Sequence, residues 1–124
     1  MLVLEELTGN ICSAAIEVHK HVGPGLLESA YEECLCFELG QREIKFRRQV
    51  PLPVVYKGVW LDCGYKIDLI VEDQVALERK SIESILAIHE AQLLTYLKIS
   101  RMKVGLLLNF NVPLMKDGIL RRVL

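Results

Sequence analysis

Three charged residues whose chemistry could act together, Asp68, Glu78 and Lys80, fall in a stretch that otherwise has the pattern of two β-strands. Residues 65–71 and 74–80 each alternate two sets of side chains on either side of a short turn, which predicts a β-hairpin. Alternate side chains of a strand share a face, so Glu78 and Lys80 lie on one face with Cα atoms roughly 6.5–7 Å apart. Asp68 on the neighbouring strand reaches that face if the register of the hairpin allows it.

These three charges predict either a cation site or a structural ion pair. A charge on an otherwise apolar ribbon is costly to bury unless it is paired or bound to a metal ion. Two carboxylates from adjacent strands can hold a hard divalent cation, and a nearby ammonium can orient a water molecule or neutralise charge on a phosphate. The alternative is a salt bridge from Lys80 to Glu78 or Asp68 on a half-exposed face. Taken by themselves the three residues favour this salt bridge, because exposed ion pairs are common.

The rest of the chain shows the helical and strand patterns that would position this hairpin. Apolar residues recur at helical spacing in two N-terminal segments separated by Gly23-Pro24-Gly25, and Gly40 has the position of a C-cap glycine. Pro51 and Pro53 place the next strands at an edge or a bulge. The expected helices are residues 4–21, 26–39 and 84–99, and the expected strands are 44–50, 52–56, 59–63, 65–71, 74–80, 104–109 and 118–123. The strands up to residue 80 are expected to form an antiparallel meander.

The helix at 84–99 connects the strand that contains Glu78 to the strand at 104–109. Crossovers of this kind join parallel strands, so these two strands should be parallel and adjacent or nearly so. On the same helix His89, Gln92 and Tyr96 form a polar stripe at positions i, i+3 and i+7. The stripe is either an ordinary solvent face or a set of groups that face a site.

Glu28 lies three residues before Tyr31 on the second helix, on a face that also has apolar side chains. A carboxylate in the first turn is stabilised by the helix dipole. The alternative is a carboxylate that points inward and takes part in a functional site. The position of Glu28 alone favours the interpretation by the helix dipole.

Length and composition predict one globular domain spanning residues 1–124. A chain of this length buries about two thirds of the surface that its unfolded form exposes, and 52% apolar with 25% charged residues argues against disorder. No apolar run approaches the ~18 residues needed to cross a bilayer, and the N-terminus lacks the basic segment of a signal peptide. We therefore expect a cytoplasmic protein with no membrane partner. The four cysteines show no zinc-type spacing and are expected to be reduced.

Residues 42–66 are rich in Lys and Arg, whereas residues 1–41 are acidic. A basic patch attracts phosphates, but a pI near 6.3 argues against strong, indiscriminate binding of nucleic acid. The alternative is a solvated edge hairpin whose basic side chains prevent aggregation.

Four sequence blocks resemble the PD-(D/E)XK nuclease superfamily. Asp68 followed by Glu78-Arg79-Lys80 is similar to its Asp…(Asp/Glu)-x-Lys signature, and Gln92-Leu-Leu-Thr-Tyr96 is similar to the Gln-x-x-x-Tyr helix motif of its exonuclease-like branch. Gly25-Leu-Leu-Glu28-Ser-Ala-Tyr31 matches the motif that names the GxxExxY proteins, which also have sequences much like residues 105–110. The resemblance covers about residues 4–123. It implies an α/β (α+β) protein with a restriction-endonuclease-like core, a mixed β-sheet in αβββαβ order flanked by helices.

The resemblance also implies roles for individual residues. Asp68 and Glu78 would bind Mg²⁺ or Mn²⁺, with the carbonyl of Arg79 as a further ligand, and Lys80 would position or polarise the attacking water. The site would be completed by Glu28, which would orient a metal-bound water or add a ligand, and by Gln92 and Tyr96, which would fix the substrate phosphate or the lysine. Arg79 itself departs from the family pattern, which has an apolar residue there.

The leading hypothesis is a divalent-metal-dependent nuclease that hydrolyses phosphodiester bonds of nucleic acid, DNA more than RNA. A second hypothesis is a non-catalytic module that keeps the nuclease fold and binds nucleic acid or protein through the basic stretch at 42–66. A third is an enzyme acting on a small phosphorylated molecule, which would need a closed pocket. A chain of this size could also form a homodimer through an apolar surface on its N-terminal helices.

Overall fold

The structure, a computed structural model, describes residues 4–124. Residues 1–3, part of the N-terminus considered above for a signal peptide, lie outside the described residues. The helices are α1 (Glu5–Val22), α2 (Glu28–Gln41), α3 (Ala87–Ser100) and the 3₁₀ helix η1 (Met115–Gly118), and the strands are β1 (Phe46–Pro51), β2 (Val54–Tyr56), β3 (Val59–Leu61), β4 (Lys66–Val71), β5 (Val75–Lys80), β6 (Val104–Asn109) and β7 (Ile119–Val123). None of the helices within residues 4–124 is long and apolar enough to span a membrane.

The centre of the fold is a mixed five-stranded sheet with the strand order β1-β4-β5-β6-β7. β5 and β6 run parallel, and the other neighbouring pairs are antiparallel. This confirms the prediction that α3 connects two adjacent parallel strands. The path α2-β1-β4-β5-α3-β6 also gives the expected αβββαβ order, with β2 and β3 inserted between β1 and β4.

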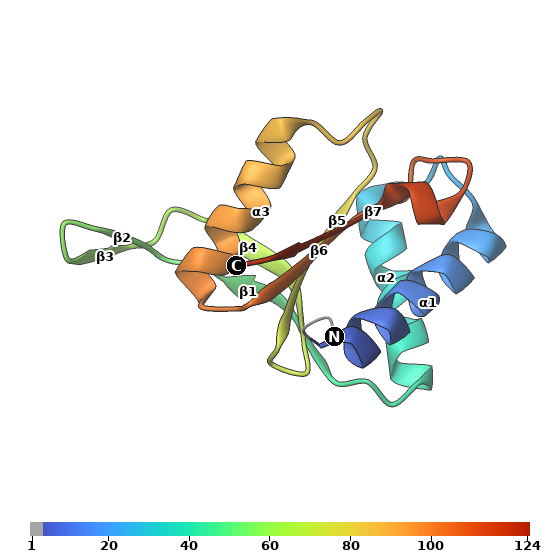
Figure 1. The fold of residues 1–124 in the computed structure, drawn as a ribbon, viewed down its shortest axis with the longest axis horizontal. Helices are drawn as coiled ribbons and strands as arrows, with labels where there is room; N and C mark the ends of the chain where they lie inside the picture. Colours follow the sequence, from blue (N-terminus) through green and yellow to red (C-terminus); the bar gives the residue numbers. More distant parts are fainter. Residues whose placement is uncertain (1–3) are drawn as a thin grey trace.

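Helices cover both faces of the sheet, α1 and α2 on one side and α3 on the other (Figure 1). Leu77 and its strand neighbours pack against α1 and α2, whereas Ile70 belongs to a second core cluster with Leu97 of α3. Gly105 on β6 allows α3 to approach closely, because a Cβ atom there would lie 2.9 Å from Leu93 Cδ1. The alternation of strand side chains thus sorts residues between two cores.

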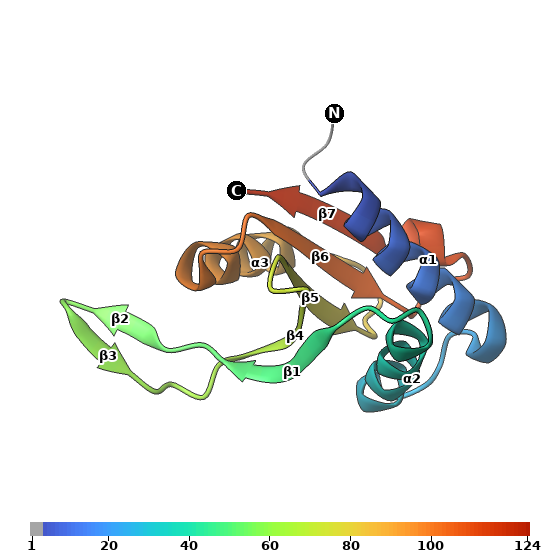
Figure 2. The same ribbon diagram turned by 90° about the horizontal axis from the view of Figure 1, so that it is seen from below.

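The predicted antiparallel meander is wrong for the second and third strands. β2 and β3 pair only with each other in a separate two-stranded sheet, and β1 pairs with β4 instead. Pro51 still pairs with Lys66, and the Leu52 amide still donates to the Tyr65 carbonyl at 2.8 Å. Pro53 follows at the break, and proline has no N–H with which to continue a ladder. The resulting hairpin, residues 54–61, extends away from the helices and the main sheet (Figure 2). We call it the arm.

Two predicted helix ends are also wrong. Gly40 is not a C-cap residue, because α2 continues to Gln41 and the positive φ of 58° falls on Glu43. The third helix begins at Ala87 and not at residue 84, because His89 Nδ1 accepts the Leu86 amide at 2.9 Å and so fixes the first turn there. A side chain three residues inside a helix can satisfy an amide that the helix leaves free.

Candidate functional site

Asp68 and Glu78 lie where β4 and β5 stop pairing. Counting from the turn, the last pair of the ladder between these strands is Leu69 opposite Leu77, and the next residue on each strand is a carboxylate. Beyond that point the amides bond to side chains: the Asp68 amide donates to Glu78 Oε1 at 3.3 Å, and the Arg79 amide donates to Asp68 Oδ2 at 2.9 Å. Both residues are buried, with 8% and 9% of their surface exposed. Each carboxylate therefore accepts a backbone amide of the other strand, at a buried point where the two strands no longer pair.

Electrostatics couple the two carboxylates. Burial and then the negative charge of Asp68 raise the pKa of Glu78 to about 8, and a side-chain hydrogen bond with Asp68 raises it further. The Asp68 amide and the charge of Lys80 act in the opposite direction. Two carboxylates close enough to share a hydrogen bond in a low-dielectric site cannot both ionise easily. At neutral pH Glu78 therefore keeps its proton.

Lys80 follows Glu78 by two residues on β5, and its charge acts on Glu78. The predicted salt bridge from Lys80 to Glu78 or Asp68 is absent. Within the part of the chain that the structure describes, the Lys80 side chain makes no hydrogen bond or ion pair. Its backbone carbonyl accepts the Phe110 amide at 2.9 Å, which continues the parallel ladder with β6. The ammonium is thus held near the carboxylates by the strand and not by pairing.

Arg79 forms the ion pairs that Lys80 lacks. Its guanidinium points to α2, with Nη1 3.0 Å from Glu28 Oε1 and Nε 3.3 Å from Glu32 Oε1, and its Nη2 lies 4.0 Å from Asp68 Oδ1. The Nε group is buried and makes no hydrogen bond of good geometry. The arginine that departs from the family pattern is therefore part of a charge network that reaches Asp68.

Sequence reasoning missed three members of this network: Glu32, Arg48 and Gln49. Glu32 is 3% exposed and accepts hydrogen bonds from Arg48 Nη2 at 2.8 Å and Gln49 Nε2 at 2.7 Å. Gln49 Nε2 also lies 3.3 Å from Asp68 Oδ1, and its φ of 49° interrupts the pairing of β1 with β4. The spacing of Glu32 four residues after Glu28 on one helix face could have identified it.

Glu28 is the first residue of α2 and is 39% exposed in its side chain. Its partner is Arg79, so it reaches the carboxylate pair only through that guanidinium. Its position in the first helical turn is the one that the helix dipole favours.

Tyr31 and Gly25, which belong to the same motif, have structural roles. The Tyr31 hydroxyl donates to the Gly23 carbonyl at 2.6 Å and accepts the Leu26 amide at 3.1 Å. Its ring is fully buried and stacks on Phe110 with centroids 4.4 Å apart. Gly25 has φ of 102°, which disfavours other residues. The motif thus fixes the loop that places Glu28.

Gln92 and Tyr96 of α3 approach the carboxylates from the face of the sheet that α3 covers, opposite to the face that α2 covers. Burial and then the charge of Glu78 raise the pKa of Tyr96, with smaller effects from Tyr65 and Asp68, while a hydrogen bond from Gln92 lowers it. Tyr65 and Tyr96 meet edge to face with ring centroids 6.0 Å apart. His89, the third member of the predicted stripe, is instead used to begin the helix.

Asn109 on β6, opposite Lys80, organises the loop that follows the Glu-x-Lys strand. It is 1% exposed, its Oδ1 accepts the Ile82 amide at 3.1 Å, and its Nδ2 donates to the Ile82 carbonyl at 3.0 Å. A buried amide side chain that pairs both backbone groups of one residue fixes that loop rigidly.

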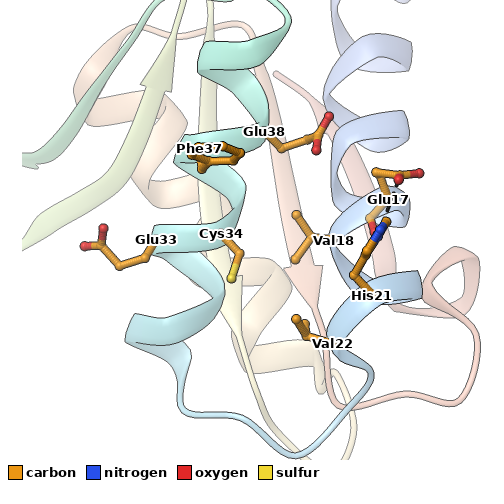
Figure 3. Close-up of a pocket in the computed structure, with 8 residues that line it drawn as sticks. All are labelled: Glu17, Val18, His21, Val22, Glu33, Cys34, Phe37 and Glu38. Atoms are coloured by element: carbon orange, nitrogen blue, oxygen red, sulfur yellow. Dashed lines mark hydrogen bonds and ion pairs between the residues drawn. The ribbon is translucent and has the colours of Figure 1, made fainter.

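The pockets of the surface lie away from the carboxylate pair. Five pockets have volumes of 240–830 Å³, and none of the five is lined by Asp68, Glu78 or Lys80. One of 410 Å³ is lined by α1 and α2, with Val18, Val22 and Phe37 among its apolar residues and Glu17 paired with His21 at its side (Figure 3). Another of 360 Å³ includes Gln92 and Tyr96. The closed pocket that a small phosphorylated substrate would need is not among these five.

A cation site with three protein side chains is not present in the described region: within residues 4–124 no three His, Cys, Asp or Glu side chains gather as metal ligands. Any cation at the carboxylate pair would use two side chains, with backbone oxygen and water completing its shell.

Comparison with known proteins gives one match. A family model described as the PD-(D/E)XK nuclease superfamily matches residues 5–123. No curated protein and no solved structure matches the chain significantly. The helices and the mixed five-stranded sheet are consistent with a restriction-endonuclease-like fold.

Proposed function

Because the chain belongs to the PD-(D/E)XK nuclease superfamily, we propose that it is a divalent-metal-dependent nuclease that hydrolyses phosphodiester bonds of nucleic acid, DNA more than RNA. The observation that carries the proposal is the buried pair of Asp68 and Glu78 at the point where β4 and β5 separate, with the unpaired Lys80 on the same strand. Burying two ionised carboxylates is costly, so Glu78 keeps its proton in the metal-free protein and would ionise when a cation joins the pair. The absence of a partner for Lys80 within residues 4–124 leaves its ammonium free to meet a phosphate.

The donor set fits Mg²⁺ or Mn²⁺. Both are hard cations that take oxygen ligands, and Mg²⁺ keeps several waters when one or two carboxylates hold it. Asp68 and Glu78 supply the carboxylates. The Arg79 amide points to β4, and in a strand the carbonyl of the same residue faces the same side, so this carbonyl would be the third protein oxygen. When bound, such a cation supplies Lewis-acid polarisation of the phosphate and lowers the pKa of water.

The residues around the pair would orient the substrate. We assign Lys80 to orienting the attacking water and neutralising charge that develops on the phosphate oxygens. Gln92 and Tyr96 would hold the phosphate or the lysine from the α3 side, since Tyr96 is close enough to Glu78 and Asp68 to be affected by their charges. Glu28 would act through Arg79, with which it pairs.

A specific observation favours a second candidate, a non-catalytic module that binds nucleic acid or protein. Asp68 already accepts hydrogen bonds from the Arg79 amide and from Gln49, so its oxygens have protein donors without a cation. Arg47 and Arg48 of the basic stretch are also paired, with Asp73 at 2.9 Å and with Glu32. In this alternative the charges form a structural network.

Calorimetric titration of Mn²⁺ into the metal-free protein separates the two candidates. The nuclease proposal expects saturable binding that is lost in Asp68→Ala and in Glu78→Gln and kept in the control Asp73→Asn, whose side chain is 79% exposed. Binding would be followed by a screen of DNA and RNA substrates with Lys80→Ala as the inactive control. Absence of saturable Mn²⁺ binding in the wild type, even with a nucleotide phosphate present, would overturn the nuclease proposal and support the module.

The proposal includes a homodimer. Closed two-fold dimers are by far the commonest homo-oligomers of soluble proteins, and a chain of this size can form one.

A further inference from the structure

The arm exposes several large apolar side chains to solvent. Residues 54–61 form a two-stranded hairpin that projects from the main sheet (Figures 1 and 2). Its exposed large side chains are Val55 (50%), Tyr56 (60%), Val59 (54%), Trp60 (72%) and Leu61 (40%). An isolated two-stranded hairpin is marginally stable in water. Large apolar side chains gathered in an exposed position on one hairpin indicate an interaction site.

Both faces of the arm are apolar. In the register of the hairpin Val55 lies opposite Trp60 on one face, and Tyr56 lies opposite Val59 on the other. Each strand also has one edge without a neighbouring strand in the described part of the chain. Unpaired edges present amides and carbonyls that can pair with another strand. The occupant must therefore supply both apolar contact and backbone hydrogen bonds, which a β-hairpin does and a nucleic acid does not.

Charge also distinguishes the occupant. The hairpin and the residues next to it, 54–63, contain one cation, Lys57, and one anion, Asp62, so the arm has no excess of positive charge with which to meet a phosphate backbone. Lys57 is at the tip and Asp62 at the base. If two arms pair antiparallel about a two-fold axis, the tip of one arm meets the base of the other. Lys57 of each copy then lies near Asp62 of its partner.

We propose that the arm is the interface of a homodimer in which the arms of two copies of this chain pair with each other. The proposal names the surface of the homodimer included above and does not depend on hydrolysis of nucleic acid. It differs from the expectation that the N-terminal helices associate. The groove between α1 and α2 is bordered by Glu17, Glu33 and Glu38, and these carboxylates already pair with basic side chains of the same chain. An interface there would have to cover ion pairs, whereas the arm offers apolar side chains.

The chain contains a single tryptophan, Trp60, which lies on the arm. Its fluorescence therefore reports on the arm alone. Sedimentation equilibrium and Trp60 emission are measured over the same range of protein concentration in the metal-free protein. The expected result is a monomer–dimer equilibrium in which the emission shifts to shorter wavelength as the dimer forms.

Variants locate the interface. Val59→Lys replaces an exposed side chain, so the fold should be unaffected, and it should weaken dimerisation at least tenfold. Phe37→Lys, a matched change at a 69% exposed residue of α2, should leave dimerisation unchanged. Lys57→Glu should weaken dimerisation, and the double variant Lys57→Glu, Asp62→Lys should restore it, because the exchange of charges between tip and base preserves their complementarity.

Any one of the following results would overturn the proposal. The first is a wild-type protein that stays monomeric at every concentration, and the second is a Val59→Lys variant that dimerises as tightly as the wild type. The third is a dimer that Phe37→Lys abolishes, which would place the interface on the helices. Quenching of Trp60 by an oligonucleotide while the protein stays monomeric would assign the arm to nucleic acid. Each of these results leaves the Mn²⁺ titration unaffected, so failure of the dimer and failure of the nuclease proposal are distinguishable.

Discussion

Replacing Glu78 by glutamine should stabilise the metal-free protein by an amount that grows with pH. Burial and the neighbouring charge of Asp68 raise the pKa of Glu78 from its ordinary value of 4.5 to about 8. The folded protein then holds this proton more tightly than the unfolded chain. The contribution to stability is complete below pH 4.5 and is lost as pH rises through about 8. Glutamine has a similar shape and does not ionise, so it keeps this contribution at every pH.

The expected size of the effect follows from the two pKa values. Neutral pH lies about 2.5 units above the pKa of the unfolded chain, and each unit corresponds to about 1.4 kcal/mol. Glu78→Gln should therefore exceed the wild type by about 3 kcal/mol in free energy of unfolding at pH 7. At pH 4 the two proteins should be nearly equal. For a domain of this length, such a gain raises the melting temperature by about 10 °C.

Urea unfolding at pH 4.5, 6, 7 and 8 in the presence of a chelator measures this difference. The control is Asp73→Asn, which removes an exposed carboxylate and should show no comparable dependence on pH. A gap between Glu78→Gln and the wild type that stays constant from pH 4.5 to 8 would refute the reasoning. A glutamine variant less stable than the wild type at pH 7 would do the same, since the carboxylate would then be stabilising as an anion.

Three further predictions concern the pair and the residues that position it. Mn²⁺ binding at pH 7 should release about one proton, because Glu78 must ionise to become a ligand; calorimetry in buffers of different ionisation enthalpy measures the number, which should fall towards zero at pH 9. Tyr31→Phe should lower the free energy of unfolding by about 0.5–1.5 kcal/mol, because the Gly23 carbonyl and the Leu26 amide lose their hydroxyl partner while the ring still stacks; urea unfolding checks it, and an unchanged midpoint would contradict it. Gly105→Ala should lower the free energy of unfolding by about 1–3 kcal/mol, because its Cβ would press on Leu93. Thermal unfolding measures the change, and an unchanged melting temperature would mean that α3 moves without loss of stability.

The strands and the site illustrate what local pattern can predict. Periods of two and of 3.6 residues placed Glu78 and Lys80 on one strand and Gln92 and Tyr96 on one helix, because both periods depend only on neighbouring residues. The crossover through α3 then required β5 and β6 to be parallel, which the register from Val75 to Lys80 confirms.

Contacts between distant segments decided the rest. The sequence could not show that Arg79 pairs with Glu28 and Glu32, because these residues are far apart in the chain and meet only when α2 packs on the sheet. It likewise could not show that Gln49 adopts a positive φ beside Asp68. Both depend on where the helix and β1 are held by the two cores.

The sequence by itself determined the order of the core elements, the faces of β5 and α3, and membership of the superfamily. Only the tertiary structure decided that β4 and β5 separate at Asp68 and Glu78, that Arg79 and not Lys80 forms the ion pairs, and that residues 54–61 leave the sheet as an arm. The physical reason is that hydrophobic periodicity is a property of short segments. Strand pairing, burial of charge and the pKa of a carboxylate depend on what the rest of the chain places beside them.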